Sequence, residues 1–120
     1  MMNLTWGTCG DNGSWCGFLS VNLAHPHFDA KEGVYIIWQK KGPIIRVGQG
    51  NIRERLSDHR RDQTIIAYDN LLVTWASVPT QSHDGVERYL ANQLNPRVGD
   101  AFPNTTPIEV NLPWRYTEIK

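Results

Sequence analysis

Residues 33–48 read GVYIIWQKKGPIIRVG, and they determine the architecture expected for the chain. Its first part, residues 34–38, is β-branched and aromatic, as is typical of strands. Residues 40–43 (Lys-Lys-Gly-Pro) have the composition of a turn, and residues 44–47 form a second short β-forming run. Two such runs on either side of a turn predict a β-hairpin.

A helix is expected immediately after the hairpin. Residues 48–50 (Gly-Gln-Gly) end the second strand, and Asn51 is a good helix N-cap with Glu54 at capping-box spacing. Ile52 and Leu56 follow at i and i+4, which places both on one buried face of the helix.

The remainder of the chain predicts one more strand and one more helix. Residues 71–78 alternate and are rich in β-formers, and Pro79 stops this third strand. Asp84 and Glu87 repeat the capping-box spacing, and the helix that they open is broken at Pro96. The apolar stripe of this helix consists of Val86, Leu90 and Leu94.

These elements predict an α+β fold, a three-stranded antiparallel sheet flanked by helices in the order β-β-α-β-α. Residues 1–32 are rich in glycine and have no sustained period, so we expect an irregular N-terminal extension. The core is expected at residues 33–98. Residues 99–120 contain three prolines, which favours an extended closing segment of the same domain.

Composition places the chain among ordinary globular proteins. It has 120 residues, 40% of them hydrophobic and 20% charged, with a formal net charge of zero. No run approaches the roughly 18 to 20 apolar residues that span a bilayer, and the N-terminus has no secretory pattern. We therefore expect a cytoplasmic protein without a membrane partner, in which Cys9 and Cys16 are free thiols.

Several residues then follow one another in the order and spacing of a known nuclease family. They are Gly33-Val34-Tyr35, Arg46-Val47-Gly48, Arg55 and His59 four apart, and Glu87 on the later helix. This pattern resembles the GIY-YIG nucleases, a family that includes phage homing endonucleases, the excision-repair incision subunit and some restriction enzymes. The resemblance covers about residues 33–96.

The resemblance implies a metal-dependent endonuclease with Tyr35, Arg55, His59 and Glu87 in its active site. It also implies Mg²⁺ or Mn²⁺ on Glu87, and Tyr35 among the candidate general bases. Arg46 stands where the family usually has a tyrosine. The family's active-site asparagine aligns near Gly99 and Asp100, or with Asn104 further on.

The residue chemistry is consistent with these roles. Arg55 and His59 are one helical turn apart, so both can reach a phosphate lying across that helix. An arginine fork gives paired, charge-assisted hydrogen bonds to phosphate, and a histidine can position or deprotonate a water. A lone carboxylate such as Glu87 can anchor a Mg²⁺ that also binds a substrate phosphate.

Nucleic acid is the expected partner, with DNA as the expected substrate, and a homodimer or a partner protein is expected to supply target choice. Local basic character supports this partner although the whole chain is neutral. We expect Arg46 to lie on the same strand face as Ile44 and to contact a phosphate. Tyr35, Arg46, Arg55, His59 and Glu87 should converge on one groove. The candidate nucleic-acid-binding residues are Lys40, Lys41, Arg46, Gln49, Arg53 and Arg60.

Other interpretations remain open from the sequence. A catalytically silent module could bind nucleic acid in the same groove without cutting it. A protein-interaction domain could present an aromatic surface built from Trp6, Trp15 and Trp114. Zinc could bind the potential ligands of the N-terminal segment, although their spacing matches no known finger. Those potential ligands are Cys9, Cys16, His25 and His27.

Overall fold

Strands β2 (Glu32–Gln39) and β3 (Ile44–Asn51) form the hairpin that the sequence predicts, in a computed structural model that describes residues 1–99 and 102–114. Strand β4 (Leu71–Ser77) pairs with the other side of β2. The short strand β1 (Cys16–Gly17) pairs with β4, which gives a four-stranded antiparallel sheet in the order β1-β4-β2-β3.

The α+β class is confirmed, but the expectation of three strands was wrong. The additional strand, β1, has only two residues and lies in a glycine-rich segment. A strand this short has no measurable alternation, and only its pairing with β4 defines it.

Helix α1 (Ile52–His59) begins where β3 ends, without an intervening loop. The side-chain oxygen of Asn51 accepts a hydrogen bond from the backbone N–H of Glu54 at 3.0 Å, so the predicted N-cap is confirmed. A short helix, α2 (Gln63–Ile66), follows before the chain enters β4.

Helix α3 (His83–Leu94) begins two residues earlier than the sequence indicates. It directly follows the 3₁₀ turn η2 (Thr80–Ser82), so Asp84 lies within its first turn and Ser82 takes the N-cap position. The predicted capping role of Asp84 was therefore wrong. The side chain of Asp84 is free to take part in other contacts.

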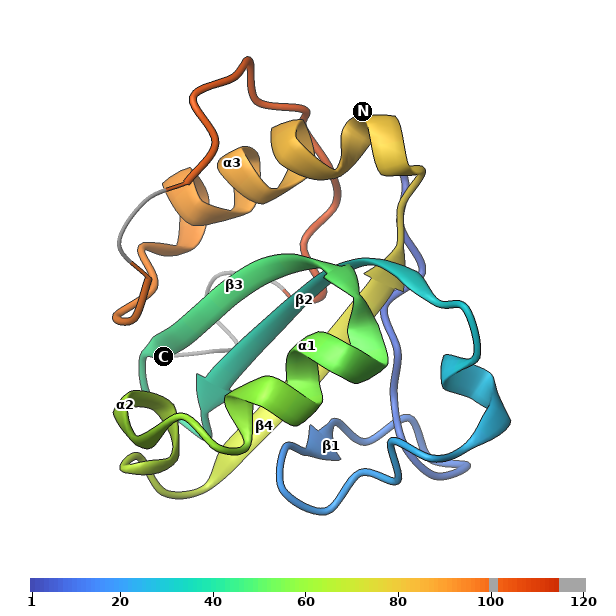
Figure 1. The fold of residues 1–120 in the computed structure, drawn as a ribbon, viewed down its shortest axis with the longest axis vertical. Coiled ribbons are helices and arrows are strands. Elements are labelled where there is room, and N and C mark those ends of the chain that lie inside the picture. The colour runs from blue at the N-terminus through green and yellow to red at the C-terminus, as the bar shows by residue number, and fades with distance from the viewer. Residues whose placement is uncertain (100–101, 115–120) are drawn as a thin grey trace.

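The sheet separates two apolar cores. On one face, Tyr35 and Ile37 of β2 pack with Ile52 and Leu56 of α1 and with the N-terminal segment. The other face packs against α3 and against residues from both ends of the chain. Figure 1 shows β3 between α1 and α3. The two helices that carry the candidate site residues thus belong to different layers.

The N-terminal segment is held in place by α1. The guanidinium group of Arg53 donates to the carbonyl oxygens of Leu23 and His25 and pairs with Asp29 at 2.6 Å. Arg60 donates to the carbonyl oxygen of Phe18 at 2.9 and 3.1 Å and to that of Val21. A 3₁₀ turn, η1 (Pro26–Phe28), lies within this segment.

The tryptophans named as a candidate interaction surface belong to the second core. Trp114 is buried, and the rings of Trp15 and Trp114 pack edge to face with centroids 5.9 Å apart. Trp6 is partly buried and donates from its ring N–H to the carbonyl oxygen of Asn111. The expectation of an exposed aromatic surface was therefore wrong, because the closing segment packs over these rings.

Cys9 and Cys16 form a disulfide, so the expectation of free thiols was also wrong. The pairing of β1 with β4 and the bridge between Cys9 and Ser14 bring the two cysteines together, with their Cα atoms 5.1 Å apart. Sequence alone did not show this turn.

None of the helices in the described part of the chain is long and apolar enough to cross a membrane. The cytoplasmic location stays a prediction.

Reduction of this disulfide should destabilise the fold measurably. The loop that it closes spans seven positions of sequence separation, and constraining a loop of this size in the unfolded chain contributes about 2.5 kcal/mol. Urea unfolding with and without reductant measures the difference. A Cys9→Ser/Cys16→Ser double variant should match the reduced protein and ignore the reductant. Equal midpoints for the oxidised and reduced wild type would contradict the expectation.

Candidate active site

Tyr35 is the innermost residue of the candidate site. It lies in β2 directly opposite Gly48 of β3, and its side chain has no exposed surface. A Cβ added at Gly48 would overlap the hydroxyl end of the Tyr35 ring, so only glycine fits under the ring. Gly48 thus has a direct packing role beside Tyr35.

Helix α1 brings His59 to the hydroxyl group of Tyr35. The Tyr35 oxygen lies 2.5 Å from Nε2 of His59, and a hydrogen bond joins the two side chains. His59 is buried, with 6% of its surface exposed, whereas the Arg55 side chain one turn earlier is 40% exposed. The structure therefore unites Tyr35 and His59 and leaves Arg55 facing the solvent.

Burial and nearby positive charge control the titration of this pair. Burial raises the pKa of the Tyr35 hydroxyl, and the charges of Arg55 and Arg46 partly oppose that rise. Burial lowers the pKa of His59 to about 4, with the charges of Arg46 and Arg55 acting in the same direction. Both side chains are therefore neutral at pH 7.

Arg46 lies on the same sheet face as Tyr35. It pairs with Ile37, whereas Trp38 pairs with Ile44, so the register shifts by one residue between them. The expected placement of Arg46 on the face of Ile44 was wrong because of this bulge. Arg46 nevertheless lies near the other candidate site residues, because it faces the side of the sheet where α1 packs.

Glu87 approaches from α3, on the other layer. Its carboxylate is buried, and Gln49 of β3 donates one amide hydrogen bond to Glu87 at 3.2 Å and another to Asp84 at 2.5 Å. Burial raises the pKa of Glu87; the Gln49 hydrogen bond and the charge of Arg46 oppose this rise. Gln49 thus connects the edge strand with two carboxylates one helical turn apart.

Asp84 is the site neighbour that the sequence interpretation missed, because its spacing from Glu87 was taken as a helix cap. The same i, i+3 spacing also places two side chains on one helix face, which was the available signal. The aligned position Asp100 lies outside the described residues. Asn104 is exposed.

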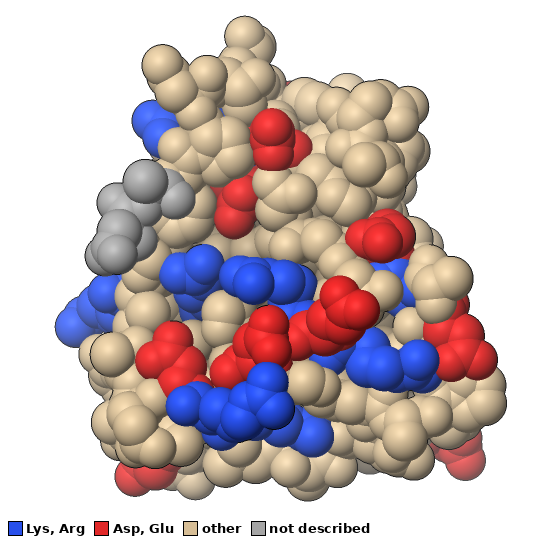
Figure 2. Space-filling view, viewed as in Figure 1, with Lys and Arg blue, Asp and Glu red and all other residues tan. Residues whose placement is uncertain are grey.

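The candidate nucleic-acid-binding residues divide into three groups. Arg46 and Gln49 lie at the site itself, whereas the guanidinium groups of Arg53 and Arg60 are used to hold the N-terminal segment. Lys40 and Lys41 are exposed at the β2–β3 turn. Figure 2 shows basic side chains in a band across the middle of one face, between α1 and α3, with acidic side chains on both sides.

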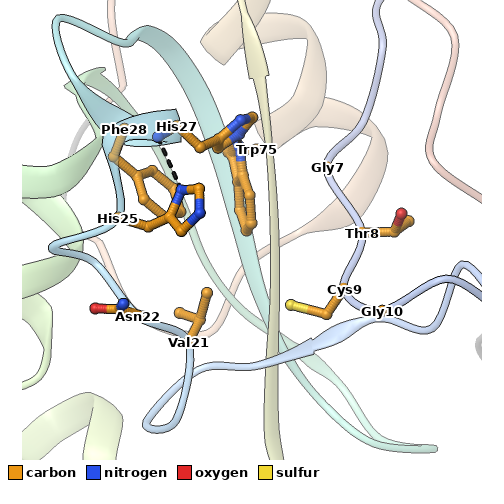
Figure 3. Close-up of a pocket in the computed structure, with 10 residues that line it drawn as sticks. All are labelled: Gly7, Thr8, Cys9, Gly10, Val21, Asn22, His25, His27, Phe28 and Trp75. Carbon is orange, nitrogen blue, oxygen red and sulfur yellow. Dashed lines mark hydrogen bonds between the residues drawn. The ribbon is translucent and has the colours of Figure 1, made fainter.

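The N-terminal segment forms a separate pocket of about 420 Å³, with Cys9, His25 and His27 among its lining residues (Figure 3). Nδ1 of His25 accepts the backbone N–H of His27, and Nε2 of His27 accepts the ring N–H of Trp75. With the cysteines in a disulfide and these ring nitrogens in use, the four side chains do not form a zinc site in this structure.

The donor chemistry at Glu87 fits a divalent cation that keeps most of its waters. Among the described residues, no group of three or more histidine, cysteine or acidic side chains is placed to hold a metal. Glu87 is a buried carboxylate without an ion pair in the same described residues, and neutralising it would relieve the cost of burial. Asp84 shares the Gln49 amide N–H donor group with Glu87 and is a second carboxylate at this place.

No protein-family model, no curated protein and no solved structure matches this chain. Assignment to the GIY-YIG family therefore stays a prediction from the signature residues. The placement of Tyr35, His59 and Glu87 in the structure is a separate observation that does not depend on that resemblance.

The pKa of His59 provides a direct test of the site geometry. Because the folded-state pKa of about 4 lies below the unfolded value of 6.5, the unfolded chain binds a proton first as the pH falls. Stability should therefore decrease between pH 6.5 and 4, by about 3 kcal/mol in total. NMR titration of the His59 ring and urea unfolding across this range measure both effects. A His59→Gln variant should lose less stability in that window. A His59 pKa near 6.5 would contradict the buried pair.

Proposed function

We propose that the protein is a metal-dependent endonuclease that hydrolyses phosphodiester bonds in nucleic acid, with DNA as the substrate. The observation that carries the proposal is the buried Tyr35–His59 hydrogen bond with Arg46 and Arg55 beside it and Glu87 across the edge strand. A purely structural tyrosine and histidine would not require two arginines and a desolvated carboxylate around them.

The proposed reaction adds water to phosphorus and breaks one ester bond, giving a phosphate monoester and an alcohol. In the tautomer with its proton on Nδ1, the neutral His59 ring accepts a hydrogen bond from Tyr35, and this coupled pair takes up the proton that the attacking water loses. Arg55 extends from α1 into solvent, where two N–H groups of its planar guanidinium can donate hydrogen bonds to one phosphate group. Stabilisation of charge on the phosphate is its main contribution.

Glu87, supported by Gln49, would hold the divalent cation. When bound, the cation would neutralise charge on the phosphate and on the departing oxygen. A single buried carboxylate binds Mg²⁺ weakly, so the phosphate completes the site. Metal affinity is therefore expected to rise when nucleic acid is present.

The experiment that tests this function is incubation of the purified protein with supercoiled plasmid in Mg²⁺, Mn²⁺ or EDTA. Cleavage that requires the metal and stops in EDTA supports the proposal. Wild-type protein that binds DNA but never cuts it would favour the catalytically silent module instead.

Glu87→Ala should abolish cleavage and leave DNA binding equal or tighter. The substitution removes both the metal anchor and a negative charge from a site that must accept phosphates. Gel-based cleavage and fluorescence anisotropy with a labelled duplex measure the two properties. Glu109→Ala removes an exposed acid of the same charge and should behave as wild type. Persistent Mg²⁺-dependent cleavage by folded Glu87→Ala would move the metal site elsewhere.

Arg55→Lys should lose nearly as much activity as Arg55→Ala. An ammonium group keeps the charge but cannot reproduce a two-pronged contact, and loss of one such donor typically lowers the rate by about 10²- to 10³-fold. Single-turnover cleavage of a labelled duplex gives the rates. Near wild-type cleavage by Arg55→Lys would show that charge alone is needed at this position.

A further inference from the structure

The register of the β2–β3 ladder places Arg46 on the sheet face of Tyr35, directly before a bulge. Arg46 is opposite Ile37, and the next ladder pair joins Trp38 to Ile44, so Ile45 is the extra residue. Arg46 and Gly48 alternate regularly in β3, so Arg46 shares the sheet face of Tyr35 and Ile37. The bulge turns Ile44 to the opposite face, into the core below α3, and leaves Arg46 as the last residue of the regular ladder on the Tyr35 face.

The guanidinium group of Arg46 reaches this position without a hydrogen-bonding partner for its Nε. This nitrogen is buried, and its N–H donates to no group of the described residues. The far end of the group lies against Gly99, where an added Cβ would be 2.7 Å from Nη1. A buried N–H donor is rarely left unpaired in a folded protein, which points to a ligand as its partner.

The position of Arg46 on β3 also distinguishes it from the arginines in and directly after α1. Its charge acts on all three central groups, namely Tyr35, His59 and Glu87. Arg53 and Arg60 are already bound to backbone carbonyl oxygens. Arg46 is therefore placed to meet an anion that enters between the Tyr35–His59 pair and the carboxylate of α3.

We propose that Arg46 is a catalytic residue that binds a non-bridging oxygen of the scissile phosphate from β3, opposite the contact made by Arg55 from α1. This inference rests on the nuclease function proposed above and deepens it. The free Nε–H and an adjacent Nη–H form one fork of the guanidinium, the geometry suited to a phosphate. A tyrosine at this place, as in the resembling family, would offer a single neutral hydroxyl instead.

The first test compares Arg46→Met and Arg46→Lys with Arg61→Met. Arg61 has the same charge but is 75% exposed and pairs only with Asp58 among the described residues, so it is a matched control. Both Arg46 variants should lower kcat about 10²-fold or more with a smaller change in KM, because the contact strengthens as charge develops on the phosphate. If the parent protein cleaves DNA and Arg46→Met keeps the wild-type kcat, the inference about Arg46 is overturned and the nuclease proposal stands.

Binding gives a second readout that does not depend on cleavage. In a Glu87→Gln background, Arg46→Met should weaken binding to a labelled duplex and reduce the salt dependence by about one counterion. The Arg61→Met control should keep the parent slope. Unchanged affinity and slope for Arg46→Met would contradict a phosphate contact. Absence of cleavage by the wild type would instead refute the nuclease proposal, and the catalytic role of Arg46 with it.

A third readout confirms that the Arg46→Met protein is folded and that Arg46 sits where described. Removing its charge should raise the pKa of His59, measured by NMR, because that charge now disfavours protonation of the ring. Arg61→Met should leave the His59 pKa where it is. A His59 pKa that does not respond to Arg46→Met would place Arg46 away from the pair and overturn the inference.

Discussion

The packing of the Tyr35 ring over Gly48 is the contact on which the rest of the site depends. Two adjacent strands are about 4.8 Å apart, and a ring can lie across its neighbour only where the facing residue has no side chain. This packing aims the hydroxyl group at α1, where His59 meets it. Once the ring is fixed, the positions of the arginines and of the carboxylate follow from the edge strand and the two helices.

The site is built around an edge strand, so it draws side chains from both layers of the protein. Tyr35 and Arg46 face the core under α1, whereas Gln49 reaches α3 and its carboxylates. The outer edge of β3 is partly covered near its start, where residues 97 and 98 donate to the carbonyl oxygens of Ile44 and Ile45. The neutral total charge of the chain conceals this local concentration of positive and negative groups.

Much of the fold could be predicted because it depends on local patterns. The hairpin, the third long strand and the Asn51 cap all have strong local signals within a few residues. The disulfide, the strand β1 and the bulge before Arg46 depend on contacts between distant segments, which a single sequence does not reveal. The same limit applies to the site: its residue types could be named, but the face of Arg46 and the bridge through Gln49 could not.

The direct junction between β3 and α1 restricts how the length of this chain can vary. Asn51 is both the last residue of the strand and the cap of the helix, so no loop separates them. One inserted residue at this point would rotate the helix by about 100° relative to the sheet and turn His59 away from Tyr35. Insertions and deletions are tolerated instead where the chain turns at the surface, such as the β2–β3 turn. The junction therefore fixes the orientation, relative to the sheet, of the α1 face that carries His59.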